Sequence, residues 1–194
     1  MGALFAPTAP ESSMPNYRRV YVSGAWYFFT VVTYDRRPIL TTQSGLAALK
    51  SAIVETRIRR PFTSIAWVIL PNHLHYIWKL PDGDADFSTR WSIIKWRFTR
   101  EFLRGTDATS GERSVSRKRH RERNVWQRRF WEHCIQDDED LRRHIDYIHY
   151  NPVKHGLVEE LLQWRFSSAH RPEYMESYLN AKSELAKIEV VGAE

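Results

Sequence analysis

The pattern of apolar and polar residues predicts a strand followed by a helix in the first third of the chain. The run at 26–34, WYFFTVVTY, is aromatic and β-branched and therefore favours a strand. Thr41 or Thr42 can cap a helix that extends to about Arg59, and Pro61 closes it. The apolar residues near helical spacing, which we expect to face the sheet, are Leu46, Leu49, Ile53 and Ile58.

A β-hairpin is predicted next. The apolar run at 65–69 leads through a Pro-Asn turn signal into a second run at 73–79. Because side chains alternate along a strand, His73 and His75 share one face at the beginning of this strand. The order of elements to this point is βαββ. The opposite face of the last strand carries Leu74, Tyr76 and Trp78.

Two more helices and one strand are predicted further along. A helix begins near Ser88 and stops at Gly105. The segment 125–135 alternates aromatic residues with cations and can supply another strand. Asp137 or Asp138 caps the last helix, and Pro152 ends it because the residue before a proline is pushed out of the α region. The buried stripes of the two helices are Phe87, Trp91, Ile94, Phe98 and Phe102, and then Leu141, Ile145 and Ile148.

The length of 194 residues suits one domain with a substantial core. Residues 1–16 are rich in proline and small polar residues, so we expect a flexible N-terminus. The domain is predicted at 17–171, interrupted by a basic flexible loop at 105–124. Residues 172–194 lack a clean periodicity and are expected to form a C-terminal tail.

The net charge of +6 favours an anionic partner, with nucleic acid as the first candidate and an acidic membrane surface as the second. The membrane alternative is weakened because no apolar run approaches the ~20 residues of a spanning helix. The N-terminus also lacks a charged segment followed by an apolar one, so we expect a cytoplasmic protein. The single cysteine, Cys134, excludes an intramolecular disulfide framework and a cysteine-rich zinc site.

Three basic segments are candidate DNA contacts. One face of the second helix carries five cations balanced only by Glu101, although such a face can simply be solvated. The loop at 105–124 can organise on a polyanion or serve as a solubilising linker. In the segment 125–135 the aromatics can stack unpaired bases or fill the core. The candidate residues are Arg90, Lys95, Arg97, Arg100, Arg104, Arg117, Lys118, Arg119, Arg121, Arg128 and Arg129.

Candidate chemistry lies in two distant stretches. The pair His73 and His75 offers two imidazole ligands for a metal, although either side chain can instead bond to the backbone. Tyr147 and Asn151 are four residues apart and share a helix face. Cleavage of a phosphodiester needs a nucleophile, a Lewis acid and a clamp on the strand. Tyr147, a metal site of His73, His75 and Asn151, and the arginines would fill these roles, whereas Tyr147 considered alone can be a solvated surface tyrosine.

These motifs resemble a known family. The tripeptide at 73–75, HLH, matches the His-hydrophobic-His motif of HUH endonucleases. The stretch at 147–158, YIHYNPVKHGLV, resembles the catalytic-helix signature of the REP-associated tyrosine transposases, which are single-tyrosine HUH enzymes. The stretches at 126–133 and 164–168 are similar to that family as well. The resemblance covers roughly residues 20–170 and leaves out the tail.

The resemblance implies an α+β, ferredoxin-like HUH domain with helices packed on a central antiparallel sheet. It implies action on single-stranded DNA at the hairpin of a repetitive extragenic palindrome (REP). Tyr147 would form a 5′-phosphotyrosine and leave a free 3′-hydroxyl, with Mg²⁺ or Mn²⁺ bound by His73, His75 and Asn151. Related insertion-sequence transposases usually have glutamine in place of Asn151, so the third ligand is shorter here. The sequence does not distinguish a monomer from a homodimer.

Two other classes of function fit the same residues. One is a non-catalytic, structure-specific nucleic-acid-binding protein. The other is a metal-dependent phosphodiesterase that uses water as its nucleophile, for which Tyr147 would be irrelevant. A covalent protein–DNA adduct distinguishes the three, because only the tyrosine mechanism forms one.

Overall fold

The computed structural model describes residues 19–104 and 124–178 of the chain. The predicted flexible N-terminus, the greater part of the predicted basic loop and the end of the predicted tail therefore lie outside the described residues. The same holds for four of the candidate DNA contacts, Arg117, Lys118, Arg119 and Arg121.

The described residues form one antiparallel sheet of four strands. The strands are β1 (Trp26–Val32), β2 (Thr63–Ile69), β3 (His73–Lys79) and β4 (Trp131–Cys134), and their spatial order is β2-β3-β1-β4. Along the chain the order is β1, α1, β2, β3, α2, β4, α4. This is the split βαβ arrangement of a ferredoxin-like fold, so the predicted α+β class is confirmed. The strand expected within 125–135 is short because only its last residues join the sheet.

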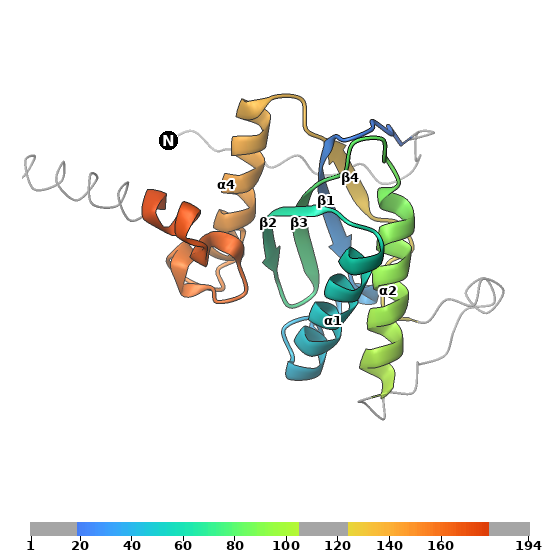
Figure 1. Cartoon of the computed structure of the whole chain (residues 1–194). Helices are drawn as coiled ribbons and strands as arrows, with labels where there is room; N and C mark the ends of the chain where they lie inside the picture. Colours follow the sequence, from blue (N-terminus) through green and yellow to red (C-terminus); the bar gives the residue numbers. More distant parts are fainter. Residues whose placement is uncertain (1–18, 105–123, 179–194) are drawn as a thin grey trace, which may run out of the picture.

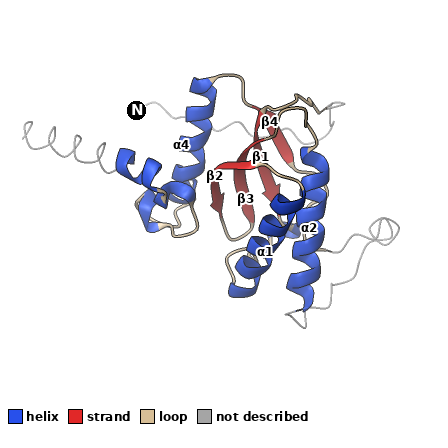
Figure 2. Cartoon of the chain, viewed as in Figure 1, coloured by secondary structure: helices blue, strands red, loops and turns tan. Residues whose placement is uncertain are grey.

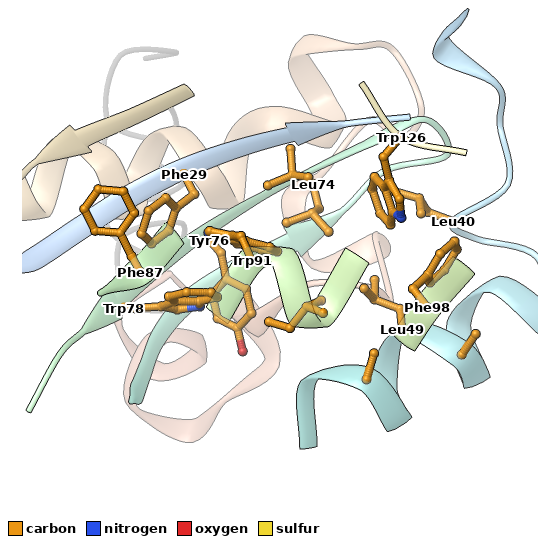
Figure 3. Close-up of a cluster of buried hydrophobic side chains, with 14 of the residues drawn as sticks. Phe29, Leu40, Leu49, Leu74, Tyr76, Trp78, Phe87, Trp91, Phe98 and Trp126 are labelled. Carbon is orange, nitrogen blue, oxygen red and sulfur yellow. The ribbon is translucent and has the colours of Figure 1, made fainter. Parts of the chain in front are cut away.

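Two helices, α1 (Gln43–Arg59) and α2 (Phe87–Arg104), pack together on one face of the sheet (Figures 1 and 2). The Thr42 side chain caps α1 by accepting a 3.0 Å hydrogen bond from the Gly45 backbone. The indole of Trp78 on β3 stacks on that of Trp91 on α2 with ring centres 4.5 Å apart, inside a core of large aromatic residues (Figure 3). Alternation along β3 therefore works as predicted, because Leu74, Tyr76 and Trp78 all enter this core.

The buried face of α1 differs from the predicted one at its end. Ile58 is 75 % exposed, so its assignment to the buried stripe was wrong. The helix instead buries the small side chains of Ala48 and Ala52 beside Leu49. Small residues let α1 approach α2 closely, and this contact shifts the buried face away from Ile58.

The opposite face of the sheet carries α4 (Asp138–Lys154), which stands apart from α1 and α2 in Figure 1. The helix is capped by the Asp137 side chain, which accepts a 2.8 Å hydrogen bond from the Asp140 backbone. Ile148 enters a second, smaller core with Phe28 from β1 and Ile77 from β3. Residues at even positions of β1 and odd positions of β3 therefore face α4, and this places His73 and His75 beneath it.

The predicted end of α4 at Pro152 was wrong, because the helix continues to Lys154 with the proline inside it. Proline removes one backbone donor, but the next turn is closed by hydrogen bonds from His155 to Asn151 (3.0 Å) and from Leu157 to Pro152 (3.0 Å). Gly156 then adopts φ +65° and ends the turn, in the manner of a left-handed C-terminal cap. Asn151 consequently lies within the helix and not at its frayed end.

The chain after α4 returns to the free edge of β2, where the Ile69 backbone N–H donates to the Phe166 carbonyl at 2.9 Å. Residues 172–178, the described part of the predicted tail, are helical. The Tyr178 hydroxyl lies 2.9 Å from Nδ1 of His149 on α4. The stretch around Phe166 therefore covers the edge of β2, and the helical residues 172–178 contact α4 through His149. Within residues 19–104 and 124–178, no helix has the length and apolar composition to cross a membrane.

Candidate active site

The two histidines of β3 meet the tyrosine of α4 in the space between the sheet and that helix. The ring centres of His73 and His75 are 5.1 Å apart, and those of His75 and Tyr147 are 5.2 Å apart. Both imidazoles are buried, whereas Tyr147 is 40 % exposed. The candidate nucleophile therefore lies at the mouth of the site, with the candidate metal ligands below it.

Asn151 completes the group predicted from the sequence. It lies one helical turn after Tyr147, is fully buried, and is close enough to His73 to influence the pKa of that histidine. Neither atom of its amide group has a hydrogen-bond partner among the described residues, and neither does Nε2 of His75. Buried polar atoms are rarely left without partners. Asn151 acts on His73, and the centre of the His73 ring lies 5.1 Å from that of the His75 ring, so the unpartnered atoms belong to one group of neighbouring side chains. Imidazole nitrogen and amide oxygen are ligand types that suit a divalent cation.

Two side chains fix the orientation of the imidazoles. The Asn72 Oδ1 atom lies 2.6 Å from Nδ1 of His73, so it accepts the proton of that nitrogen. The Thr30 hydroxyl lies 2.9 Å from Nδ1 of His75, opposite which Thr30 is paired in the sheet. Occupying Nδ1 leaves Nε2 of each ring as the ligand atom, as in most metal-binding histidines.

Both imidazoles are uncharged at neutral pH. Burial lowers the pKa of His73 to about 4, assisted by the nearby charges of His155 and Arg36. Burial also lowers the pKa of His75 to about 3, with smaller contributions from His73, His155 and Lys154. A metal ligand must be deprotonated, so the environment holds both side chains in the form that binds a cation.

Several neighbours of the site were not predicted. The Lys154 ammonium lies 5.1 Å from the centre of the Tyr147 ring, and the His155 ring lies 5.2 Å from that of His73. The spacing of seven residues from Tyr147 to Lys154 places both on one helix face, a signal that the sequence contains. Thr30 was not identifiable in this way, because its role depends on which strands pair.

Arg90 was expected to contact DNA, and the structure corrects this expectation. Its side chain is 1 % exposed, and its guanidinium donates to both carboxylate oxygens of Asp84 at 3.1 and 2.6 Å. It also donates to the carbonyls of Arg60, Pro61 and Asp86. All N–H donors of the Arg90 guanidinium are therefore used to join the end of α1 to the start of α2.

The other cations of α2 lie on the far side of the sheet from Tyr147, and several already have partners. Arg97 forms an ion pair with Glu55 of α1, and Lys95 donates to the Gln127 carbonyl at 2.8 Å. The expectation that only Glu101 balances this face was therefore wrong. Arg100 lies over the ring of Trp96, and Arg104 keeps 68 % of its side chain exposed.

The aromatic and basic stretch at 125–135 divides between two roles. Trp126 is buried in the large core, whereas Trp131 on β4 is 51 % exposed. Arg128 and Arg129 are exposed immediately before that strand. Core packing and surface exposure thus alternate within one segment, which neither of the two interpretations of the sequence anticipated.

A second group of possible metal ligands lies beside the site. The ligand atoms of His133, Asp140 and His144 lie within 4.8 Å of one another, close enough to hold a metal ion. In the structure the Asp140 carboxylate instead pairs with both imidazoles, at 2.7 and 3.0 Å. The two rings are stacked 13° from parallel, so their in-plane lone pairs run side by side, and a shared ion would require one ring to turn.

The four-stranded sheet, its paired histidines and the tyrosine of the covering helix have the arrangement expected for a tyrosine HUH enzyme. No protein-family model matches the chain. The chain is 45 % identical over 159 residues to the REP-associated tyrosine transposase of Escherichia coli K12, covering 81 % of this chain and 84 % of the relative. A Haemophilus influenzae protein assigned to the same family is 42 % identical over 165 residues, covering 85 % and 91 % respectively.

A solved structure agrees with these sequence relatives. It is that of a REP-associated tyrosine transposase bound to a REP hairpin, and it matches with a TM-score of 0.67 at 45 % identity, covering 81 % of this chain and 84 % of that one. The chain therefore belongs to the family of REP-associated tyrosine transposases.

Proposed function

We propose that the protein cleaves and rejoins single-stranded DNA at palindromic, REP-like hairpins, with Tyr147 as the nucleophile. Family membership supports the reaction class, and the relative solved with a REP hairpin supports the type of substrate. One observation carries the proposal. Nε2 of His75 and the amide of Asn151 are buried without a hydrogen-bond partner among the described residues, and the neighbouring Tyr147 is exposed to solvent.

The Tyr147 hydroxyl attacks the scissile phosphate, and its oxygen forms a new bond to phosphorus. The phenol gives up its proton to water, and the bond from phosphorus to the 3′-oxygen breaks. That oxygen takes up a proton from water, which leaves a 5′-phosphotyrosine and a free 3′-hydroxyl. The exposed position of Tyr147 lets a strand approach from solvent. Lys154, whose ammonium lies 5.1 Å from the centre of the tyrosine ring, brings a positive charge near the attacking phenol and the phosphate. Rejoining reverses these steps with a 3′-hydroxyl as the attacking group.

The side chains of His73, His75 and Asn151 would hold Mg²⁺ or Mn²⁺. They fit this role because the imidazoles are neutral and oriented by their Nδ1 partners, and because the buried Asn151 amide oxygen has no hydrogen bond from residues 19–104 or 124–178. When bound, the cation supplies Lewis-acid stabilisation of charge on the phosphate oxygens. Phe28 closes the site from the side of β1, with its ring centre 5.4 Å from that of His75.

The DNA is held by exposed cations of the chain. Arg128 and Arg129 precede β4 on the exposed surface, and the net charge of +6 attracts the phosphates of a single strand. The cations predicted at 117–121 lie outside the described residues and remain candidates for the same role. Arg90 is not among the DNA contacts, because its guanidinium is buried.

Labelled hairpin oligonucleotides with a single-stranded extension test this proposal when incubated with the protein and Mn²⁺. We expect a covalent protein–DNA adduct on a denaturing gel. A non-catalytic binder would shift the hairpin on a native gel without cutting it. A water-using phosphodiesterase would cut the strand without forming an adduct.

A further inference from the structure

The face of the sheet that carries the candidate active site is only partly covered. The helix α4 packs chiefly on β2 and β3, which form one half of the sheet. On the other half, Thr30 of β1 and Trp131 of β4 lie opposite each other in the antiparallel pair. Thr30 is partly exposed, and Trp131 is 51 % exposed. A large indole therefore lies open on the same face as His75 and Tyr147.

The Trp131 ring is the outermost member of a stack of three rings. It lies nearly parallel to the ring of His133, at an angle of 5° and a centre distance of 6.1 Å. The His133 ring in turn stacks on that of His144 at 4.7 Å. The Asp140 carboxylate fixes the inner two rings, at 2.7 Å from His133 and 3.0 Å from His144. The Asp140 carboxylate thus orders the two histidine rings, and the exposed indole lies parallel to the outer one.

One phenylalanine connects this stack to the nucleophile. The Phe28 ring lies edge-on to Trp131 at 5.6 Å and edge-on to Tyr147 at 6.0 Å. The indole and the phenol therefore flank a single ring on one continuous surface. Lys154 lies beside Tyr147 on this surface, and the exposed Arg128 and Arg129 come just before Trp131 in the chain.

We propose that Trp131 is a stacking site for an unpaired nucleobase that flanks the scissile phosphate. The inference rests on the proposed function, since it places the phosphate at Tyr147. Stacking accepts any base because every base has a flat π-face, so the site selects for unpaired DNA and not for sequence. Lys154 and the arginines that precede Trp131 in the chain match the charge of a nucleic-acid strand, and a single strand can splay one base onto the indole where a duplex cannot.

The test compares the binding of two hairpins by the full chain, one blunt and one with a single-stranded extension. Trp131→Ala should weaken binding of the extended hairpin by about 10-fold or more, the effect of removing one stacked base. Binding of the blunt hairpin should change by less than about 2-fold, and Trp131→Phe should restore most of the affinity. The matched control is Trp96→Ala, which removes an indole of similar exposure, 57 %, from α2 on the far side of the sheet.

A second readout locates the base directly. With 2-aminopurine placed at successive positions of the extension, fluorescence quenching should be strongest at one position for the wild type and absent for Trp131→Ala. Equal weakening for both hairpins, no weakening at all, or the same weakening in Trp96→Ala would overturn the inference. A change of oligomeric state in Trp131→Ala with unchanged DNA binding would also overturn it, since the indole would then contact another protein. If the wild type forms no covalent adduct, the proposed function fails, while the hairpin comparison still decides the role of Trp131.

Discussion

Replacing Arg90 by alanine distinguishes an internal brace from a DNA contact. The guanidinium is 1 % exposed and pairs with an Asp84 carboxylate that is 33 % exposed. Removing one partner of a buried ion pair costs about 3–5 kcal/mol, because the remaining polar groups are left without compensation. The carboxylate is partly solvated, so we expect the lower end, about 3 kcal/mol. In a domain of this size, that destabilisation lowers the melting temperature by about 6–12 °C.

The same pair makes stability depend on pH. Hydrogen bonding from Arg90, the largest favourable cause, holds the pKa of Asp84 below its ordinary value. A carboxyl group with a lowered pKa stabilises the fold above its unfolded pKa of about 3.9, and the stabilisation is lost as pH falls through the folded value. The stability difference between wild type and Arg90→Ala should therefore be full at pH 7 and shrink below about pH 4.

Chemical denaturation followed by tryptophan fluorescence measures the effect, and a DNA titration at several salt concentrations accompanies it. Arg60→Ala is the matched control, because its ion pair with Asp86 is solvated at 3.4 Å and should be worth less than about 1 kcal/mol. The reasoning would be refuted if Arg90→Ala were as stable as Arg60→Ala and bound DNA with a flatter salt dependence.

Three further predictions concern the metal, the C-terminal segment and the basic loop. His73→Ala combined with His75→Ala should abolish Mn²⁺ binding measured by calorimetry while hairpin affinity stays within a few-fold, whereas His144→Ala should retain Mn²⁺; the opposite pattern would move the metal to the cluster around Asp140. Tyr178→Phe removes a hydroxyl 2.9 Å from His149 and should cost about 1–3 kcal/mol in urea unfolding; an unchanged midpoint would show that the segment does not brace α4. Neutralising the loop cations should reduce the log–log salt slope of DNA binding by up to ~0.7 for each phosphate that they neutralise, and an unchanged slope would make the loop a spectator; the residues are Arg117, Lys118, Arg119 and Arg121.

Local signals account for the parts of the fold that the sequence predicted well. The caps at Thr42 and Asp137 depend on side chains that bond within their own turn, so nearby residues suffice to identify them. Alternation along β3 is equally local, and it placed His73 and His75 on one face and Trp78 on the other. The helical spacing of Tyr147 and Asn151 depends only on the geometry of one helix.

The failures involve partners that are distant in the sequence or rules that have local exceptions. Arg97 looked free because its partner, Glu55, lies on α1. Arg90 looked free because the carbonyls of Arg60 and Pro61 reach it only once α1 and α2 are packed together, although its carboxylate partner, Asp84, lies only six residues before it. Pro152 remains inside α4 because hydrogen bonds of the following turn compensate for the missing donor.

Two features around the active site, the contact of Thr30 with His75 and the exposure of Trp131, could not be predicted for a similar reason. The interaction of Thr30 with His75 depends on the register of β1 against β3. The exposure of Trp131 depends on how far α4 extends across the sheet, and no pattern within residues 125–135 contains that information.

The most direct test of the central claim is the covalent adduct formed by Tyr147→Phe compared with Tyr150→Phe. The first change deletes one oxygen from a partly exposed ring, so the fold and hairpin binding should persist. Tyr150 is the matched control, since it lies on the same helix and is 57 % exposed. With labelled hairpin DNA and Mn²⁺, adduct and cleaved product should vanish together in Tyr147→Phe and remain in Tyr150→Phe. An adduct that persists in Tyr147→Phe and disappears in Tyr150→Phe would contradict the assignment of the nucleophile, and cleavage without any adduct would contradict the tyrosine mechanism itself.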